Sequence, residues 1–198
     1  MNLKSPERMQ QLLAAAATCF ARRGFHRTTM DEIAREAGVS AGLIYRHFAG
    51  KEDLIVAMVD EHRHAELARI LAASREPTLA AALDQLVTPD PTTKDPRADG
   101  LVNAEIVSEA LRNPRIEAVV RAGDDAVRAA LVTLIAAAQQ RGEVDPALEP
   151  GIAAELLLAL REGLRVRDAF ASPEERAQFV TAQASVGRAC RRLLGLAD

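Results

Sequence analysis

The sequence has few aromatic residues. They make up 3% of its 198 residues, with no tryptophan and a single tyrosine, Tyr45. After residue 55 the only aromatic residues are Phe170 and Phe179. A binding pocket in this later part would therefore be aliphatic and would lack the aromatic walls that hold flat cations.

Cysteine and long apolar runs are scarce as well. Cys19 and Cys190 lie near opposite ends of the chain in no metal-ligand spacing, which argues against a disulfide framework or a zinc cluster. We interpret both as small apolar residues in packed helices, with a redox sensor as the alternative. No apolar run approaches the ~20 residues of a membrane span, and Glu7 and Arg8 interrupt any signal peptide. We expect a cytoplasmic protein with no membrane segment and no cofactor.

The charge is unevenly distributed along the chain. The formal net charge is −3, yet residues 1–55 hold eight Lys/Arg against six Asp/Glu, which makes this part +2. The remainder holds 17 against 22 and is −5. A basic first part on an acidic remainder permits binding to nucleic acid without proving it.

The pattern of apolar residues predicts helices throughout. Alternating β-branched runs are absent, and apolar residues recur at helical spacing. We therefore expect an all-α protein of about nine helices, with a Pro- and Thr-rich loop at 88–96. The expected helices span residues 6–23, 30–37, 41–48, 51–73, 78–87, 98–112, 114–141, 146–170 and 173–194.

The first three expected helices predict a helix-turn-helix. The second helix begins with a capping box, Thr29 and Glu32, and the four residues "AGVS" separate it from the third. This layout is that of a DNA-binding helix-turn-helix, whose second helix enters the major groove. We predict a DNA-binding domain over residues 1–50 and a second domain over 51–198, with the helix from residue 51 as the connector.

The third helix has the residue types that major-groove binding requires. Its start is small, its end carries hydrogen-bond donors, and two apolar residues four apart can anchor it from behind. The members of these three sets are Ser40, Ala41 and Gly42, then Tyr45, Arg46 and His47, then Ile44 and Phe48.

A longer stretch around this helix has a family resemblance. The 43 residues "LLAAAATCFARRGFHRTTMDEIAREAGVSAGLIYRHFAGKEDL", from residue 12 to 54, resemble the N-terminal part of the TetR family of bacterial transcriptional regulators. The resemblance implies phosphate contacts from Thr29, Tyr45 and Lys51. It also implies that Ser40 touches DNA. Groove contacts are implied for a further set, Ala41, Gly42, Leu43, Arg46 and His47.

Two positions depart from the family pattern. Members often carry Lys, Arg or Pro at position 41 and a small polar residue at 43, where this sequence has Ala41 and Leu43. Leu43 either presses on a thymine methyl group or packs inward. Two further alternatives stay open: His47 as a plain surface residue, and Tyr45 as a core tyrosine.

The resemblance implies that the second domain binds a ligand and forms a homodimer. Charged residues at helical spacing there are surface ion pairs or line a ligand pocket, and we name Glu105, Glu109, Arg112 and Arg128 as ligand-binding candidates. The last two helices would form the dimer interface, for which we name Leu160, Leu164, Phe179, Val186 and Leu193. The segment "DEHRH" (60–64) invites a metal-site interpretation, because Asp60 and His64, or His62 and Glu66, stand one helical turn apart. The further ligands of a catalytic zinc are missing, so we interpret the segment as a solvated helix face.

These observations together predict a homodimeric repressor and not an enzyme. It would bind double-stranded DNA at a palindromic operator and be released by a small-molecule effector, aliphatic or lipid-like. An enzyme would need a nucleophile–base pair, metal spacing or phosphate loop that the sequence does not have. A helical adaptor that binds only protein would leave the donors of the third helix without purpose.

Overall fold

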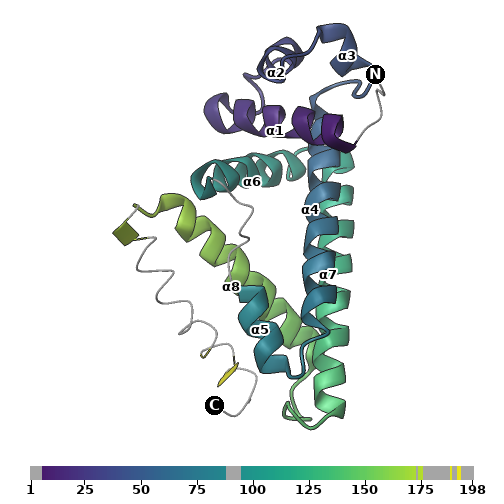
Figure 1. The fold of residues 1–198 in the computed structure, drawn as a ribbon, viewed down its shortest axis with the longest axis vertical. Coiled ribbons are helices and arrows are strands. Elements are labelled where there is room, and N and C mark those ends of the chain that lie inside the picture. Colours follow the sequence, from purple (N-terminus) through teal and green to yellow (C-terminus); the bar gives the residue numbers. More distant parts are fainter. Residues whose placement is uncertain (1–5, 88–94, 173, 176–187, 189–190, 193–198) are drawn as a thin grey trace. The chain divides into compact units, whose positions relative to one another are not determined.

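The computed structural model describes residues 6–87, 95–172, 174–175, 188 and 191–192. Within these residues the protein has eight α-helices and no β-strand (Figure 1), which confirms the all-α prediction. The helices are α1 (Pro6–Arg23), α2 (Met30–Glu36), α3 (Ala41–Tyr45), α4 (Lys51–Ala73), α5 (Leu79–Val87), α6 (Pro96–Ala110), α7 (Pro114–Gln140) and α8 (Pro150–Phe170). Most of the helix expected over 173–194 and of the loop expected at 88–96 lies outside the described residues.

The helices form two compact units, each with its own core. One unit comprises residues 6–62 and 95–122, and the other comprises residues 63–87 with the described residues from 123 onward. The boundaries fall inside α4 and α7, so each of these helices contributes to both units. The division at residue 50 that the sequence suggests stays a prediction.

The first unit contains α1, α2, α3 and α6. The inner face of α1 is the predicted one, because Leu12, Leu13, Ala16 and Phe20 are all buried. In this unit α1 and α6 lie side by side (Figure 1), and Val102 and Ala110 of α6 belong to the same apolar core as α1.

The end of α1 is set by Gly24. Its φ of 78° lies in the left-handed region that favours glycine. The chain then turns back, and the ring of Phe25 packs on that of Phe20 with 5.4 Å between centroids. The predicted stop and fold-back of α1 are therefore confirmed.

The caps of α2 and α3 follow from the sequence. Thr29 and Glu32 form the expected capping box of α2, and the Ser40 hydroxyl accepts a hydrogen bond from the Leu43 N–H at 3.3 Å. The third helix ends at Tyr45, earlier than the expected Phe48. The chain still turns there, because the N–H groups of residues 47 and 48 both donate to the Ile44 carbonyl at 3.0 Å.

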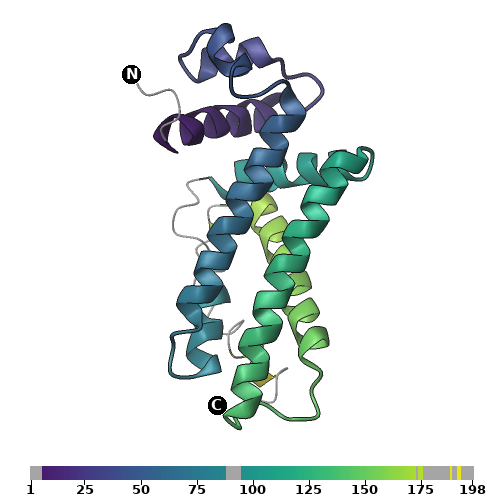
Figure 2. The ribbon, with the colours of Figure 1, turned by 90° about the vertical axis from the view of Figure 1, so that its right-hand side faces the viewer.

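The second unit packs the later part of α4 against α5, α7 and α8. After α4 the chain reverses, and α5 runs back beside it (Figure 2). Arg69 of α4 donates to the carbonyl oxygens of Gln85 and Leu86 in α5 at 3.4 and 3.2 Å. The core of this unit is aliphatic, with Leu131 and Ile135 of α7 among its buried residues.

The helix expected to start at residue 146 starts at Pro150 instead. Glu149 is the N-cap, and its carboxylate accepts from the N–H groups of residues 151 and 152. The preceding loop is held by Gln139, whose Nε2 donates to the carbonyl oxygens of Asp145 and Leu148 at 3.0 and 2.7 Å. The sequence prediction chose the wrong proline of two, because both stand where a helix can begin.

None of the described helices combines the length and the apolar character that crossing a membrane requires.

One carboxylate of the first unit makes its stability depend on pH. Asp53 accepts from the Arg115 guanidinium at 2.6 Å and from the Ala49 N–H at 2.8 Å, and these hydrogen bonds lower the pKa of its carboxyl. A lowered folded-state pKa means that the carboxylate stabilises the fold above its unfolded pKa of about 4 and loses this effect as the pH falls further.

We therefore expect Asp53→Asn to lower the free energy of unfolding by about 1 kcal/mol at pH 7 and by less at pH 3. Urea unfolding at the two pH values measures the difference. Glu117→Gln, at an exposed carboxylate paired with Arg121, is the control and should change little at either pH. An equal loss for Asp53→Asn at both pH values would contradict the assignment.

Candidate nucleic-acid interface

The third helix is anchored from one side only. Ile44 is 0% exposed, and Phe48 in the following turn is also buried, in the core shared with α1 and α2. The predicted apolar anchor is therefore confirmed. A five-residue helix has no stability of its own, so these two side chains hold α3 in place.

The start of α3 is open. Ser40, Ala41 and Gly42 are exposed, and a Cβ added at Gly42 would meet nothing within 4 Å. The backbone at Gly42 does not have a positive φ, so nothing in the described fold requires glycine there. An open, small helix start is what a helix needs to approach base edges closely.

The donors at the end of α3 point away from the core. Tyr45 is 52% exposed, which rules out the alternative of a core tyrosine. Arg46 is exposed, and its guanidinium has no hydrogen bond or ion pair with the residues that the structure describes. His47 is half-buried with its ring centroid 6.3 Å from that of Phe48. Leu43 is half-buried too, so both of its interpretations remain open.

Two of the predicted phosphate contacts already have partners within the protein. The Thr29 hydroxyl donates to Glu32 at 3.1 Å. Lys51 Nζ donates to the carbonyl oxygens of Phe25 and His26 at 2.6 and 3.2 Å and lies 4.6 Å from the Phe25 ring centroid. Its partial burial lowers the pKa of the Lys51 amine. A phosphate would have to share these donors, and the DNA contacts of both residues stay predictions.

The structure adds one cation that the sequence prediction did not name. Arg27 lies in the turn between α1 and α2, is exposed, and makes no ion pair within the described part of the chain. By contrast, Arg22 and Arg23 pair with acids of α2, Glu36 and Glu32. The sequence could not show which of these arginines are paired with acids, because the pairing depends on how α1 packs against α2.

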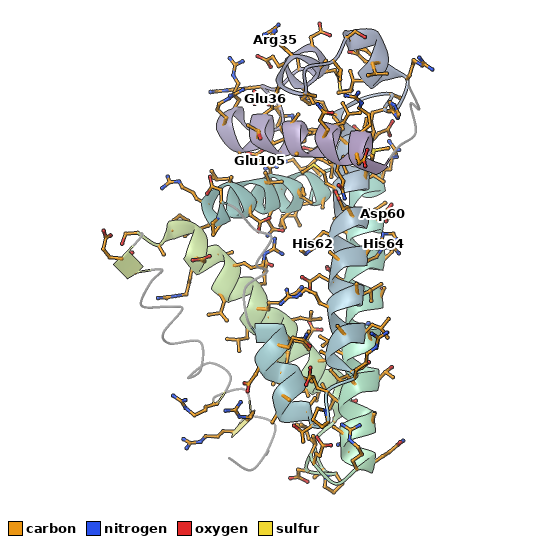
Figure 3. All side chains as sticks on the ribbon, in the orientation of Figure 1. Arg35, Glu36, Asp60, His62, His64 and Glu105 are labelled. Carbon is orange, nitrogen blue, oxygen red and sulfur yellow. The ribbon has the colours of Figure 1, made fainter. Side chains whose placement is uncertain are left out.

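The ligand-binding candidates on α6 contact the same turn. Glu105 lies between α6 and α1 (Figure 3) and accepts from the Phe25 N–H at 2.8 Å. Glu109 is buried and lies 3.3 Å from His26 Nε2. These carboxylates join α6 to the turn that precedes α2.

The four candidates do not form one site. Glu105, Glu109 and Arg112 belong to the first unit, whereas Arg128 belongs to the second. Arg112 is exposed and donates to the Ser108 carbonyl at 2.8 Å, and Arg128 is exposed and pairs with Asp125 at 2.8 Å. Their roles in ligand binding stay predictions.

The predicted dimer residues are only partly within the described chain. Leu160 and Leu164 lie on α8 and are half-buried, while Phe179, Val186 and Leu193 lie outside the described residues. A different face of α8 carries exposed residues that are apolar or small at alternating spacings of four and three: Ile152, Leu156, Ala159, Gly163, Val166 and Phe170. Phe170 is 83% exposed. This spacing is the heptad pattern of helices that pack together, and it could have been seen in the sequence.

The segment 60–64 does not assemble a metal site. Within the part of the chain that the structure describes, no three His, Cys, Asp or Glu side chains gather so as to hold a metal ion. His62 and His64 point to opposite sides of α4 (Figure 3).

Comparison with known proteins adds independent findings. Residues 12–58 match the sequence model of the bacterial regulatory proteins, tetR family. Residues 75–195 match the model of the C-terminal part of BetI-type transcriptional repressors. The chain is also 26% identical over 197 residues to the HTH-type transcriptional regulator UidR of Escherichia coli (strain K12), covering 98% of this chain and 95% of UidR.

Two solved structures are similar over most of the chain. Salmonella enterica GusR has a TM-score of 0.76 and 29% identity, covering 98% of this chain and 100% of that one. A putative transcriptional regulator from Saccharomonospora viridis in complex with choline has a TM-score of 0.66 and 25% identity, covering 82% of this chain and 85% of that one.

Proposed function

This chain belongs to the TetR family of bacterial transcriptional regulators, and from that premise we propose that it is a repressor released from a palindromic operator by a small-molecule effector. The resemblance of residues 12–54 is thus confirmed, and with it the prediction of a DNA-binding regulator. One structural observation carries the proposal: α3 is buried at Ile44 and open along Ala41, Gly42 and Tyr45.

We expect the opposite sides of α3 to have separate roles. The buried side fixes the helix, and the exposed side reads DNA. Ala41 and Gly42 would face the groove, while Tyr45 and Arg46 would contact phosphates and the groove edge. Arg27 is a further candidate for a phosphate contact, since it is exposed near the start of α2.

A homodimer would place two such helices on one operator. Two heads that read one palindrome must lie about 34–36 Å apart to meet successive major grooves. The exposed stripe of α8, from Ile152 to Phe170, supports a helix-to-helix interface between two copies. An effector that binds only one arrangement of the heads shifts the population by its differential affinity. Such a repressor would act in the bacterial cytoplasm on nucleoid DNA.

The effector proposed here is aliphatic. The core of the second unit contains no aromatic side chain among its described residues, so aromatic walls for a flat cation are missing there. A DNA-binding regulator fits this chain better than an enzyme, because the family to which it belongs consists of regulators.

The test is selection of binding duplexes from a random library, followed by fluorescence anisotropy at two salt concentrations. We expect the selected duplexes to share an inverted repeat and to bind about a thousandfold more tightly than a scrambled duplex. Tyr45→Ala should weaken binding to both duplexes, whereas Thr18→Ala, at an exposed hydroxyl that bonds within α1 to the Ala14 carbonyl, should not. Absence of binding at low salt would reject the proposal in favour of a protein adaptor.

A further inference from the structure

A charged cluster lies inside the second unit, between α4 and α8. Glu66 of α4 is 6% exposed. Its two carboxylate oxygens are bound by two guanidinium groups: Arg69 Nη1 lies 3.5 Å from Oε1, and Arg161 Nη1 of α8 pairs with Oε2. All three residues belong to the same unit, so the cluster is internal to it.

The cluster has more positive than negative charge. A single carboxylate pairs with two guanidinium groups. Arg69 also donates hydrogen bonds to the carbonyl oxygens of Gln85 and Leu86. Arg161 has no such second partner: its Nε is buried and donates no hydrogen bond to the described residues. Buried polar groups are nearly always hydrogen-bonded, so an unsatisfied donor on a charged group calls for a reason.

The surroundings of Arg161 also favour the binding of a negative charge. Burial, with the neighbouring Arg165 adding to it, lowers the pKa of the Arg161 guanidinium. A charged group in such surroundings interacts strongly with an opposite charge, because little water screens it.

Aliphatic residues stand close to the charged residues along both helices. Leu157 and Leu158 precede Arg161 by four and three residues, so they lie on the same side of α8, and Leu67 follows Glu66 on α4. All three pack on the core of the second unit.

We propose that Arg161 anchors the anionic head group of the effector and that the aliphatic side chains around it hold an apolar tail. The inference rests on the regulator function proposed above and names the ligand class: an organic monoanion such as a carboxylate with a hydrocarbon chain. A planar, bidentate guanidinium matches a carboxylate well. The buried Nε of Arg161 is then the donor that the ligand satisfies.

The same residues select against a quaternary ammonium. The structural neighbour from Saccharomonospora viridis was solved with choline, whose cation is usually held by aromatic rings. Here the described core offers no aromatic ring, and the surplus positive charge at Arg161 would repel the ligand. We therefore do not expect this chain to bind choline, although its fold is similar to that of the neighbour.

The experiment is isothermal titration calorimetry of the full chain with three probes of equal chain length, below their micelle concentrations. The probes are decanoate, decan-1-ol and decyltrimethylammonium. We expect decanoate to bind about tenfold or more tightly than decan-1-ol, and the cation to bind most weakly. Arg161→Gln should remove the preference for decanoate and leave decan-1-ol unchanged, and Arg161→Lys should retain part of it.

A second variant distinguishes a ligand anchor from a structural ion pair. Glu66→Gln removes the carboxylate that competes for Arg161, so decanoate should bind more tightly than to the parent. If Arg161 only stabilised the fold, this variant would bind decanoate equally or more weakly, and the proposal would be overturned even if Arg161→Gln failed to fold. Arg75→Gln removes an exposed positive charge from the same unit and is the matched control.

Three results would reject the inference: no binding of decanoate, no preference for it over decan-1-ol, or an undiminished preference in a folded Arg161→Gln. Operator binding is measured separately on the same preparations without any probe. Retained operator binding with no decanoate preference would reject only the anion site, whereas loss of operator preference would reject the regulator function and leave the calorimetric result standing.

Discussion

Replacing Ile44 by alanine is expected to lower the free energy of unfolding by about 2–5 kcal/mol and to abolish operator binding. Ile44 is fully buried in the core that α3 shares with α1 and α2. Its truncation removes apolar burial and leaves a cavity that the surroundings fill only in part. The five residues of α3 cannot hold their helical form without this contact, so the exposed side of α3 that we propose to contact DNA is lost with it.

Thermal unfolding with circular dichroism measures the effect on stability. For a chain of this length each kcal/mol lowers the midpoint by about 2–4 °C. Leu43→Ala, one residue earlier and only half-buried, is the matched control and should cost less than half as much. If both variants unfolded at the same temperature as the parent, α3 would not depend on the core for its position.

Gly42→Ala is expected to raise stability slightly and to weaken operator binding by at least thirtyfold. A Cβ at this position meets nothing within 4 Å, and the backbone is not left-handed. Alanine in a helix is favoured over glycine by about 0.5–1 kcal/mol. On DNA, however, the added methyl group would hold the helix away from the base edges. Contacts there are worth about 1–3 kcal/mol in each head, and a dimer loses them twice, which corresponds to a factor of about thirty or more.

The two effects have opposite signs, so folding cannot explain the loss of binding. Anisotropy against the selected operator measures affinity, and urea unfolding measures stability. The scrambled duplex is the control, because phosphate contacts dominate binding there and should be little changed. Parental affinity for the operator would show that the first turn of α3 does not approach the bases.

The sequence predicted well those parts that depend on local chemistry. The end of α1 at Gly24, the capping box of Thr29 and the cap at Ser40 each depend on a few consecutive residues, and each is present. The inner face of α1 follows from helical spacing alone. The predicted start of α8 was wrong. Pro146 and Pro150 each follow an acidic residue that can cap a helix, and only the second of these acids, Glu149, is the cap in the structure.

Features that depend on packing between distant segments were beyond the sequence. Glu105 and Arg128 looked alike as charged helix residues, yet one bonds to the α1–α2 turn and the other to its own helix. The partnership of Lys51 with the carbonyl of Phe25 needs the turn to close over it. The pairing of Glu66 with Arg161 joins residues 95 positions apart, and no sequence pattern within either helix predicts it.

The burial of Cys19 makes its thiol a probe of how often the core of the first unit opens. Its side chain is 1% exposed in the core that also holds α3, and burial together with the nearby Glu36 raises the pKa of its thiol. A thiol in this state reacts with an alkylating reagent only when the surrounding helices open. Once Cys190 is replaced by serine, the alkylation rate of the folded chain therefore counts the openings of that core, on free protein and on DNA alike.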